Sequence, residues 1–442
     1  MQIRRIVIGN ICELNSETIS SSNSPEIIRY LDTSSITKNI IECFQLLDSR
    51  QTLFPSRAKR KVKNGTIIYS TVRPNLEHFG YLVNPEENLI VSTGFLTIDV
   101  IDKDIDFKFL YYAITQKHIT DYLHTIAVNN VSSYPSINPS DIGNLELKIP
   151  RDKTVQRRIA SVLSSLDSKI ETNNRINSEL EAMAKTLYDY WFVQFDFPNA
   201  EGKPYNISCG KMVWNKELKR DIPEGWEVYK VGDLLYTSLG GTPSTTVKAY
   251  WENGNINWLN SGEIANFPII ASELKVTEAA TRNSATEIMP KGSVMLSITR
   301  HLRPSILGID ACANQSVVGI KEKGDIKCYY LYPYLKNEVT RLNAMRSGAQ
   351  QPHINKEIVD ESFILIPNEC SNILKTYNSE VGHLYELIIN KALQNQQLAA
   401  LRDWLLPMLM NGQVTVGSSA ENKASYEIEE EIRLAAEPIV EK

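Results

Sequence analysis

Residues 156–195 read QRRIASVLSSLDSKIETNNRINSELEAMAKTLYDYWFVQF, and this stretch decides the fold. Its apolar side chains recur at alternating steps of three and four residues, which is the spacing of a helix with a coiled-coil seam. They are Ile159, Leu163, Leu166, Ile170, Leu180, Ala184, Leu187 and Trp191. No proline interrupts the stretch. At 1.5 Å per residue it predicts a helix roughly 60 Å long, which exceeds ordinary globular helices.

The same pattern returns near the end of the chain and stops before Pro407. Its members are Tyr377, Leu384, Leu387, Leu398, Leu401 and Leu405. Both seams turn polar in the middle, at Asn173 and Asn177 in the first and at Lys391 and Gln394 in the second. Buried amides in such a seam commonly fix register and partner. We expect antiparallel pairing with a globular domain at each end of a rod; the alternative is a core helix inside each domain.

The two helical stretches belong to a longer repeat, because five anchors recur in the same order in both halves. The pairs are Ile8-Gly9-Asn10-Ile11 with Val231-Gly232-Asp233-Leu234; Lys63-Asn64-Gly65 through Ser70 and Arg73 with Lys291-Gly292 through Ser297 and Arg300; Pro135-Ser136-Ile137-Asn138 with Pro352-His353-Ile354-Asn355; Ile149-Pro150 with Ile366-Pro367; and 187–191 with 401–405. A period of half the chain is too long for a solenoid and indicates a tandem duplication.

Each half also contains a globular part. β-rich runs at 66–69, 293–297 and 363–366 predict strands of a curved sheet, and aromatic stretches at 107–122 and 329–342 predict helices packed on it. The predicted class is α+β, with two pseudo-repeated mixed α/β domains with curved sheets joined by two long antiparallel coiled-coil helices. The expected parts are a first domain (1–152), a spacer helix (153–197), a linker and second domain (198–368), a second spacer helix (369–412) and an acidic, disordered tail (413–442).

Composition limits the possible functions. The chain has 442 residues, 42% of them apolar, which suffices for two or three domains, and its net charge is −5. Because the tail holds seven acidic and three basic residues, the remainder is nearly neutral, and a DNA-facing surface must be a local basic patch. The six cysteines form no metal-binding pattern with histidine, and no membrane-spanning apolar run occurs. We expect a soluble, cytoplasmic protein with reduced thiols and neither metal nor cofactor.

A family resemblance rests on motifs in a fixed order. Residues 222–234 read IPEGWEVYKVGDL, and Gly240-Gly241-Thr242-Pro243-Ser244, Tyr250-Trp251, Ile256-Asn257-Trp258, Asn314-Gln315, Ser347-Gly348-Ala349-Gln350, Ile366-Pro367 and LRDWLLP at 401–407 follow. In this order the chain resembles the specificity subunits of type I restriction-modification enzymes. The first half departs from the pattern, since it lacks the opening Trp and the Gly-Gly-Thr-Pro-Ser run. The steps before both helices, RDKTV at 151–155 and NECSN at 368–372, depart as well.

The resemblance implies that each domain reads one half of a bipartite double-stranded DNA target. The helices then set the spacing and bind methyltransferase subunits, and restriction subunits can join. A rigid spacer between two readers suits half-sites about one helical turn apart, roughly 34–36 Å. The helix residues expected at subunit interfaces are Leu163, Ile170, Asn173, Asn177, Leu187, Trp191, Leu384, Leu398, Leu401 and Leu405.

Candidate DNA contacts follow from residue type, because Arg pairs bidentately with guanine and Asn or Gln with adenine. In the first half they are Arg73, Asn75, Asn130, Ser132, Ser133 and Tyr134, with Lys59, Arg60 and Lys61 expected on phosphate. In the second half they are Thr242, Ser244, Arg300, His301, Arg303, Arg346, Gln350 and Gln351. The alternative for any one of them is a solvated loop residue. Tyr250, Trp251 and Trp258 are expected to pack in the core.

A catalytic role finds little support. Asp141 with Glu146-Leu147-Lys148 resembles a metal-dependent nuclease motif, but the second half has Phe363-Ile364-Leu365 at the matching positions. The Gly-Gly-Thr-Pro-Ser run lacks the lysine of a phosphate-binding loop, and no amino-methyltransferase motif occurs. We therefore expect no catalytic residues. A duplicated protein-binding adaptor and, less favoured, a fused methyltransferase or nuclease remain as alternatives.

Overall fold

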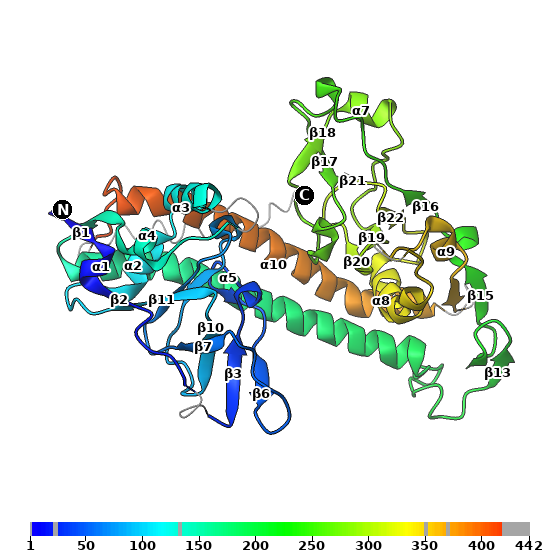
Figure 1. Ribbon diagram of the computed structural model, residues 1–442. Helices are drawn as coiled ribbons and strands as arrows, with labels where there is room; N and C mark the ends of the chain where they lie inside the picture. The colour runs from blue at the N-terminus through cyan, green and yellow to red at the C-terminus, as the bar shows by residue number, and fades with distance from the viewer. Residues whose placement is uncertain (1, 21–24, 131–134, 349–351, 368–371, 418–442) are drawn as a thin grey trace. The chain divides into compact units, whose positions relative to one another are not determined.

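The computed structural model describes residues 2–20, 25–130, 135–348, 352–367 and 372–417. The chain divides into two compact units: Met1–Glu171 with Gln396–Lys442, and Thr172–Asn395. Each unit combines sheets with helices, which confirms the predicted mixed organisation (Figure 1). Among the described residues, no helix is both long and apolar enough to cross a bilayer.

The first unit is built on two four-stranded sheets and two strand pairs. One sheet is antiparallel, in the order β2 (Cys12–Leu14), β11 (Phe95–Val100), β8 (Ile67–Ser70) and β9 (Phe79–Tyr81). The other has the order β6 (Gln45–Asp48), β3 (Ile27–Leu31), β10 (Leu89–Ser92) and β7 (Ala58–Lys61), with β3 and β10 parallel. The paired strands are β1 (Ile3–Val7) with β12 (Glu146–Pro150), and the short β4 (Ile36–Thr37) with β5 (Ile40–Ile41).

Helices and a buried aromatic cluster complete the first unit. The helices are α1 (Ile8–Ile11), α2 (Phe107–Ile114), α3 (Lys117–Asn130) and α4 (Pro139–Gly143). The stretch predicted as one aromatic helix is thus two helices. The break follows from side chains that bond the end of α2: Thr115 Oγ1 donates to the Tyr111 carbonyl (2.9 Å) and Gln116 Nε2 to the Ala113 carbonyl (3.0 Å).

The second unit repeats this plan. Its antiparallel sheet has the order β16 (Thr237–Leu239), β22 (Val317–Ile320), β19 (Val294–Ser297) and β20 (Arg303–Ile306). Its second sheet has the order β18 (Leu274–Val276), β17 (Ile256–Leu259) and β21 (Ala311–Ala313), with β17 and β21 parallel. The strand pairs are β15 (Glu227–Lys230) with β23 (Phe363–Ile366), and β13 (Met212–Asn215) with β14 (Arg220–Pro223). The helices are α6 (Val231–Leu234), α7 (Glu278–Arg282), α8 (Cys328–Ala344) and α9 (Lys356–Asp360).

The sequence anchors occupy matching places in the two units. Gly65 and Gly292 both have left-handed backbones, with φ of 85° and 87°, directly before β8 and β19. Their N–H groups donate to the carbonyls of Leu82 (2.8 Å) and Leu307 (2.9 Å). A side chain is costly at such φ values, so glycine suits both turns. The two sheets therefore begin from the same turn chemistry.

Both long helices are present, with bounds close to those expected. The first, α5, spans Lys153–Tyr188 and continues into a π-helical turn at Asp189–Val193. The second, α10, spans Ile373–Met410, so the expectation that it stops before Pro407 is wrong. Proline lacks an N–H and removes one helical bond, but Leu409 and Met410 are buried in the core of the first unit. That burial holds the last turn.

Side chains link the two helices within each unit. In the first unit Arg402 on α10 pairs with Asp167 on α5 at 2.8 Å. In the second, Asn173 Nδ2 donates to Gln394 Oε1 (2.9 Å) and Asn395 Oδ1 (2.8 Å). Asn177 Nδ2 donates to the Ile388 carbonyl at 3.2 Å. Within this unit, residue numbers therefore rise along α5 as they fall along α10, so the two helix segments run antiparallel. Of the polar residues expected in mid-seam, Asn173 therefore bonds Gln394 across the two helices, whereas Asn177 bonds the backbone of α10.

Residues just after α10 also contact the first unit. Arg158 Nη1 donates to the Val416 carbonyl at 3.2 Å, and the Val416 side chain packs against the core of this unit. The structure thus describes five residues of the expected tail at 413–442, and one of them, Val416, contacts this core. The rest of it, from 418, lies outside the described residues.

Candidate nucleic-acid interface

An exposed arginine with an unusual backbone stands at the same strand end in each unit. Arg73 and Arg300 have left-handed φ values of 45° and 57°. A residue with a side chain pays roughly 1–2 kcal/mol for that region, and such outliers cluster at functional sites. Their N–H groups donate to the carbonyls of Pro135 (2.9 Å) and Pro352 (3.2 Å). The structure thus imposes the same strained turn twice.

The segment that begins at Pro135 in the first unit, and at Pro352 in the second, makes further equivalent hydrogen bonds to that strand end. The Ile137 N–H donates to the Thr71 carbonyl at 2.8 Å, and the Ile354 N–H donates to the Ile298 carbonyl at 3.0 Å. Isolated bridges, Val72 with Ser136 and Thr299 with His353, flank them. In each unit, therefore, the arginine turn and the segment that follows the second predicted loop lie together.

In the second unit Arg346 acts on this turn through the backbone. One of its Nη atoms donates to the carbonyls of Pro352, at 2.9 Å, and of Arg300. Its Nε is buried and has no partner among the described residues. A guanidinium used in this way positions Arg300. His301 and Arg303 are exposed on either side of the buried Leu302, and Arg303 begins β20.

The glycine-rich loop of the second unit is held against the same region. The Gly241 N–H donates to the Ala313 carbonyl at 2.8 Å, and a Cβ on Gly240 would lie 2.2 Å from the Asn314 carbonyl oxygen. Only glycine fits so close an approach. As a result, Thr242 and Ser244 are exposed beside the turn between β21 and β22.

The aromatic residues near this loop pack as expected and also anchor it. Trp258 is buried and Trp251 half-buried, with ring centroids 5.1 Å apart and planes at 82°. Trp258 Nε1 donates to the Gly241 carbonyl (3.0 Å) and Trp251 Nε1 to the Ser244 carbonyl (3.1 Å). Tyr250 packs against the same cluster. These rings serve as a rigid support.

The basic residues Lys59, Arg60 and Lys61 lie on β7, which pairs with β10 at the edge of a sheet in the first unit. At the matching edge in the second unit the structure describes only an isolated bridge, Met289 with Ala311. Lys59 is exposed. Arg60 is half-buried, and desolvation lowers the pKa of its guanidinium. Lys61 lines a cavity of about 560 Å³ together with carboxylates that include Glu17 and Asp99. Of the three, Lys59 is therefore the best placed for phosphate.

The other candidates of the first unit are described in part. Asn75 is exposed in a short 3₁₀ turn, Pro74–Leu76, directly after Arg73. Asn130 ends α3, but its side chain lies outside the described residues. Ser132, Ser133, Tyr134, Gln350 and Gln351 also lie outside them.

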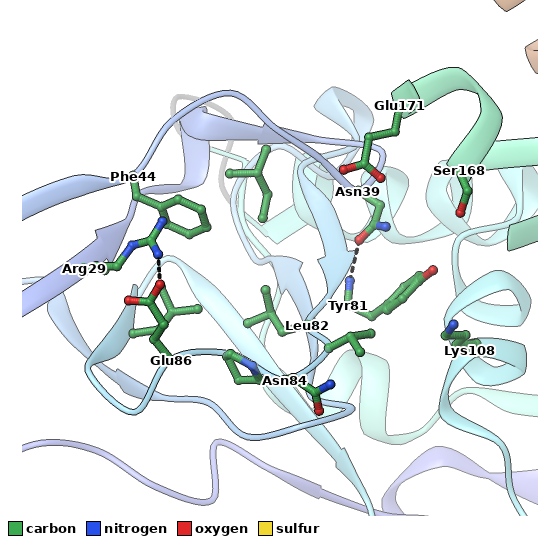
Figure 2. A pocket seen from close by; sticks show the side chains of 14 residues that line it. Arg29, Asn39, Phe44, Tyr81, Leu82, Asn84, Glu86, Lys108, Ser168 and Glu171 are labelled. Atoms are coloured by element: carbon green, nitrogen blue, oxygen red, sulfur yellow. Dashed lines mark hydrogen bonds and ion pairs between the residues drawn. The ribbon is translucent and has the colours of Figure 1, made fainter. Parts of the chain in front are cut away.

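A second hollow in the first unit has mixed charge. It has a volume of about 450 Å³ and is lined by β-sheet residues and by Ser168 and Glu171 of α5 (Figure 2). Arg29 packs over the Phe44 ring at 4.4 Å and pairs with Glu86. Lys108 and Glu171 add one charge of each sign to this ion pair, so the hollow has no excess of positive charge to attract a phosphate backbone.

The helix candidates are mostly packed inside the chain. Leu163, Ile170, Asn173, Trp191 and Leu384 are buried. Asn177, Leu187, Leu398, Leu401 and Leu405 are half-buried. A buried side chain contacts its own chain, so only the exposed side chains of these helices are open to another molecule. Exposed apolar residues there are Met183, Leu387 and Trp404.

The residues with a nuclease-like spacing have structural partners. The Asp141 carboxylate accepts from the Asn138 N–H at 2.7 Å in the capping box of α4. Glu146 and Lys148 are exposed on β12. Among the described residues, no cluster of three or more His, Cys, Asp or Glu could hold a metal.

Three residues of this region were not among the sequence candidates: Gln315 in the second unit, and Arg57 and Thr93 in the first. Gln315 and Thr93 stand at the same place in equivalent turns, beside Arg300 and Arg73 respectively. The sequence did carry a signal for Gln315, because Asn314-Gln315 is one of the motifs on which the family resemblance rests. Arg57 and Thr93 had no such signal, because their proximity arises only when β7 joins the sheet.

The chain matches the family described as "Type I restriction modification DNA specificity domain" over residues 5–182 and 223–379. It is 23% identical over 460 residues to the type I restriction enzyme HindI specificity subunit of Haemophilus influenzae, covering 92% of this chain and 98% of that protein. It is 28% identical over 359 residues to the MjaIX specificity subunit of Methanocaldococcus jannaschii, covering 80% and 78%. A solved type I restriction-modification S subunit from M. genitalium has the same fold, with a TM-score of 0.52, 14% identity and 95% and 97% coverage.

Proposed function

Because the chain belongs to the family of type I restriction-modification DNA specificity domains, we propose that it is a specificity subunit. Its role is to bind double-stranded DNA at a bipartite target, one half-site for each unit, and it has no catalytic site of its own. One observation carries this function: the family match falls once in each half, and each matched segment contains the equivalent strained arginine turn.

The chemistry of the two turns suits base reading. Arg73 and Arg300 are exposed cations that can pair bidentately with guanine in a major groove. We assign direct contacts to them with Asn75, Thr242, Ser244, His301 and Arg303, and to Asn130, Ser132, Ser133, Tyr134, Gln350 and Gln351, which the structure leaves undescribed. Lys59, and with it Arg60 and Lys61, would add phosphate contacts. Arg346 would act by holding the Arg300 turn.

The two long helices would act as the spacer. We propose that α5 and α10 pair as an antiparallel coiled coil, supported by the Asn173–Gln394 and Asn177–Ile388 bonds within one unit and by Asp167–Arg402 within the other. Their exposed faces would bind methyltransferase subunits and, in a complete complex, restriction subunits. The parts 1–152, 153–197, 198–368 and 369–412 would then be reader, spacer, reader and spacer, in a cytoplasmic complex with DNA.

The decisive experiment is selection from a duplex library with a randomised centre. The chain is purified with its methyltransferase subunits, and the retained duplexes are sequenced. We expect two short blocks of fixed bases separated by a stretch of constant length whose bases are unspecified. Retention without any base preference, or a single block, would contradict the function.

The same preparation separates the catalytic alternative. The chain alone, given the methyl donor and magnesium, should neither methylate nor cut DNA, whereas the complex should methylate. Activity of the isolated chain would identify a fused enzyme. Absence of salt-dependent DNA binding by the complex would favour the protein-binding adaptor.

A further inference from the structure

Arg57 directly precedes β7, the edge strand of the sheet β6–β3–β10–β7 in the first unit. Its carbonyl accepts from the Thr93 N–H at 2.8 Å, and the next residue, Ala58, is buried and pairs with Ser92 in the sheet. The Ala58 N–H donates to the Pro55 carbonyl at 2.8 Å, which closes the turn before the strand. The backbone of Arg57 is therefore held on both sides, while its side chain is exposed.

The same bonds place Arg57 beside the arginine turn of this unit. Gly94, which follows Thr93, accepts at its carbonyl from both the N–H (2.9 Å) and the Oγ1 (3.0 Å) of Thr71. Arg73 follows Thr71 by two residues, with its left-handed backbone. Two exposed arginines therefore stand at adjacent strand ends of one unit.

A hydrogen-bonded carboxylate lies close to Arg57. Asp32 Oδ1 accepts from the Tyr30 hydroxyl at 3.0 Å, and Asp32 Oδ2 accepts from the Ser34 hydroxyl at 3.2 Å. Burial is the main cause that raises the pKa of Tyr30, the hydrogen bond to Asp32 raises it further, and the positive charge of Arg57 lowers it. Arg57 and Asp32 thus lie near one hydroxyl. Within the described part of the chain Arg57 has no ion-pair partner, so its guanidinium remains available to a ligand.

The nearby carboxylate limits the groups that suit Arg57. A phosphate group that reached Arg57 would also approach Asp32, and two anions repel each other. The major-groove edge of guanine carries no net charge, and its O6 and N7 accept two hydrogen bonds from one guanidinium. The paired cytosine donates from N4, and an aspartate can accept that bond. Arg57 and Asp32 together therefore suit a G·C base pair better than the backbone of DNA.

The second unit differs at the matching sheet edge. Its parallel strands β17 and β21 correspond to β3 and β10. The segment that reaches β21 through the bridge of Met289 with Ala311 reads SATE at 284–287, which contains an acid and no base. Thr286 Oγ1 donates to the Gly241 carbonyl at 2.7 Å, so the glycine-rich loop lies at this edge instead. The exposed arginine of the first unit therefore distinguishes one reader from the other.

Resting on the proposed function, we propose that Arg57 is a specificity-determining residue of the first unit and that it reads a guanine in a major groove. It belongs to none of the motifs by which the chain resembles its family, as is required of a residue that sets the target of one chain. The half-site read by the second unit does not depend on it.

The test is the library selection described above, run with Arg57→Ala and Arg57→Gln complexes. Arg57→Ala should reduce the preference for guanine at one position of one block by about tenfold, equivalent to ~1.4 kcal/mol. Arg57→Gln should shift that position toward adenine, because a glutamine amide matches adenine N6 and N7. The other block should be unchanged, which also shows that the variant complex is folded and assembled.

Two other cations of the same unit are matched controls. Lys59, two residues further along β7, is exposed and assigned to phosphate. Lys59→Ala should weaken binding to all duplexes about equally and reduce the dependence of binding on salt, with no change in the bases selected. Arg50 is an exposed arginine at the opposite end of the same sheet, where it pairs with Asp48. Arg50→Ala should change neither affinity nor base preference.

The possible results separate this inference from the function on which it rests. If the native complex selects two blocks but both Arg57 variants select the same bases as the native complex, the inference fails while the proposed function stands. Uniform weakening with a smaller salt dependence, as expected for Lys59→Ala, would identify a phosphate contact and overturn it. Altered base preference in both blocks would overturn it too, since that indicates a structural role. If the native complex selects no bipartite sequence, the proposed function fails and the inference with it.

Discussion

At the scale of single residues, the left-handed backbones of Arg73 and Arg300 allow an effect on folding stability to be distinguished from an effect on DNA binding. The sequence placed Arg73 and Arg300 in a repeat, but it could not reveal their φ values, because backbone strain depends on the proline carbonyls that accept their N–H groups. Packing of the side chains does not account for strain that recurs at these matched positions, since both side chains are exposed. Relieving it should therefore stabilise the chain and impair DNA binding.

Glycine tests that separation at Arg300. Arg300→Gly should leave the free energy of unfolding unchanged or raise it by up to about 1 kcal/mol, because glycine adopts the left-handed region without strain. The same variant should bind target DNA at least about tenfold more weakly, through loss of a bidentate base contact. Urea unfolding and DNA titration measure the two effects. Arg282→Gly, at an exposed arginine on α7, is the control for loss of charge.

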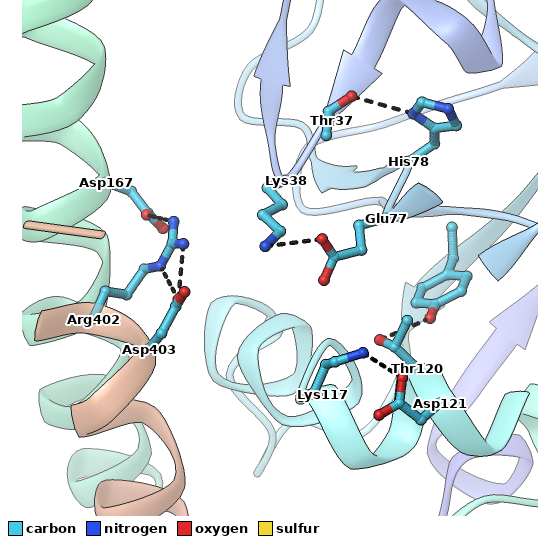
Figure 3. Close-up of polar contacts among 11 residues, drawn as sticks. Thr37, Lys38, Glu77, His78, Lys117, Thr120, Asp121, Asp167, Arg402 and Asp403 are labelled. Carbon is cyan, nitrogen blue, oxygen red and sulfur yellow. Dashed lines mark hydrogen bonds and ion pairs between the residues drawn. The ribbon is translucent and has the colours of Figure 1, made fainter. Parts of the chain in front are cut away.

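At the scale of elements, the tie between the two long helices in the first unit is a buried ion pair. Figure 3 shows Arg402 on α10 in contact with Asp167 on α5, at 2.8 Å. Tyr112 on α2 donates to the same carboxylate at 2.5 Å. The Arg402 and Asp167 side chains are only 13% and 16% exposed. The Asp167 contact is the main reason that the pKa of Arg402 lies above its usual value, against the opposing effect of burial. The Arg402 guanidinium therefore stays charged at any ordinary pH.

Breaking this pair from one side should be costly. Asp167→Ala should lower the free energy of unfolding by about 3 kcal/mol, because it leaves a buried guanidinium without its main partner. The double variant Asp167→Ala with Arg402→Leu should be markedly less destabilised than the sum of the two single changes. Urea unfolding of the single and double variants measures the coupling. Additive effects would show that the contact contributes nothing.

The elements also show what sequence can and cannot predict. Both long helices and the strands around Ile68, Met295 and Leu365 follow from periodicity, because each pattern reports a local backbone repeat. The continuation of α10 through Pro407 does not, because it depends on burial of its last turn in a distant core. The hydrogen bond between Thr242 and Gln315 could not be predicted for the same reason, because residues far apart in the sequence come together only when the sheet forms.

At the scale of the whole molecule, the negative charge is concentrated at one end. Seven acidic and three basic residues lie from 418 onward, which gives 3 − 7 = −4 of the net −5. The rest of the chain is almost neutral, so under the proposed function its DNA affinity would depend on local groups such as Lys59 and the two arginine turns. An anionic segment of this charge would oppose the binding of DNA at low salt.

Two truncations distinguish the effect of the acidic residues from 418 onward from the effect of the contacts that residues 413–417 make. A chain ending at Gly417 should still select both half-sites. It should bind DNA a few-fold more tightly at low salt, and this difference should vanish at high salt because screening removes the repulsion between the tail and DNA. A chain ending at Gly412 should lose about 1–2 kcal/mol of unfolding free energy in addition, because Val416 leaves the core and its carbonyl no longer accepts from Arg158. Titration at several salt concentrations and urea unfolding distinguish the two effects. Loss of base selection in the longer chain would mean that the acidic segment takes part in recognition.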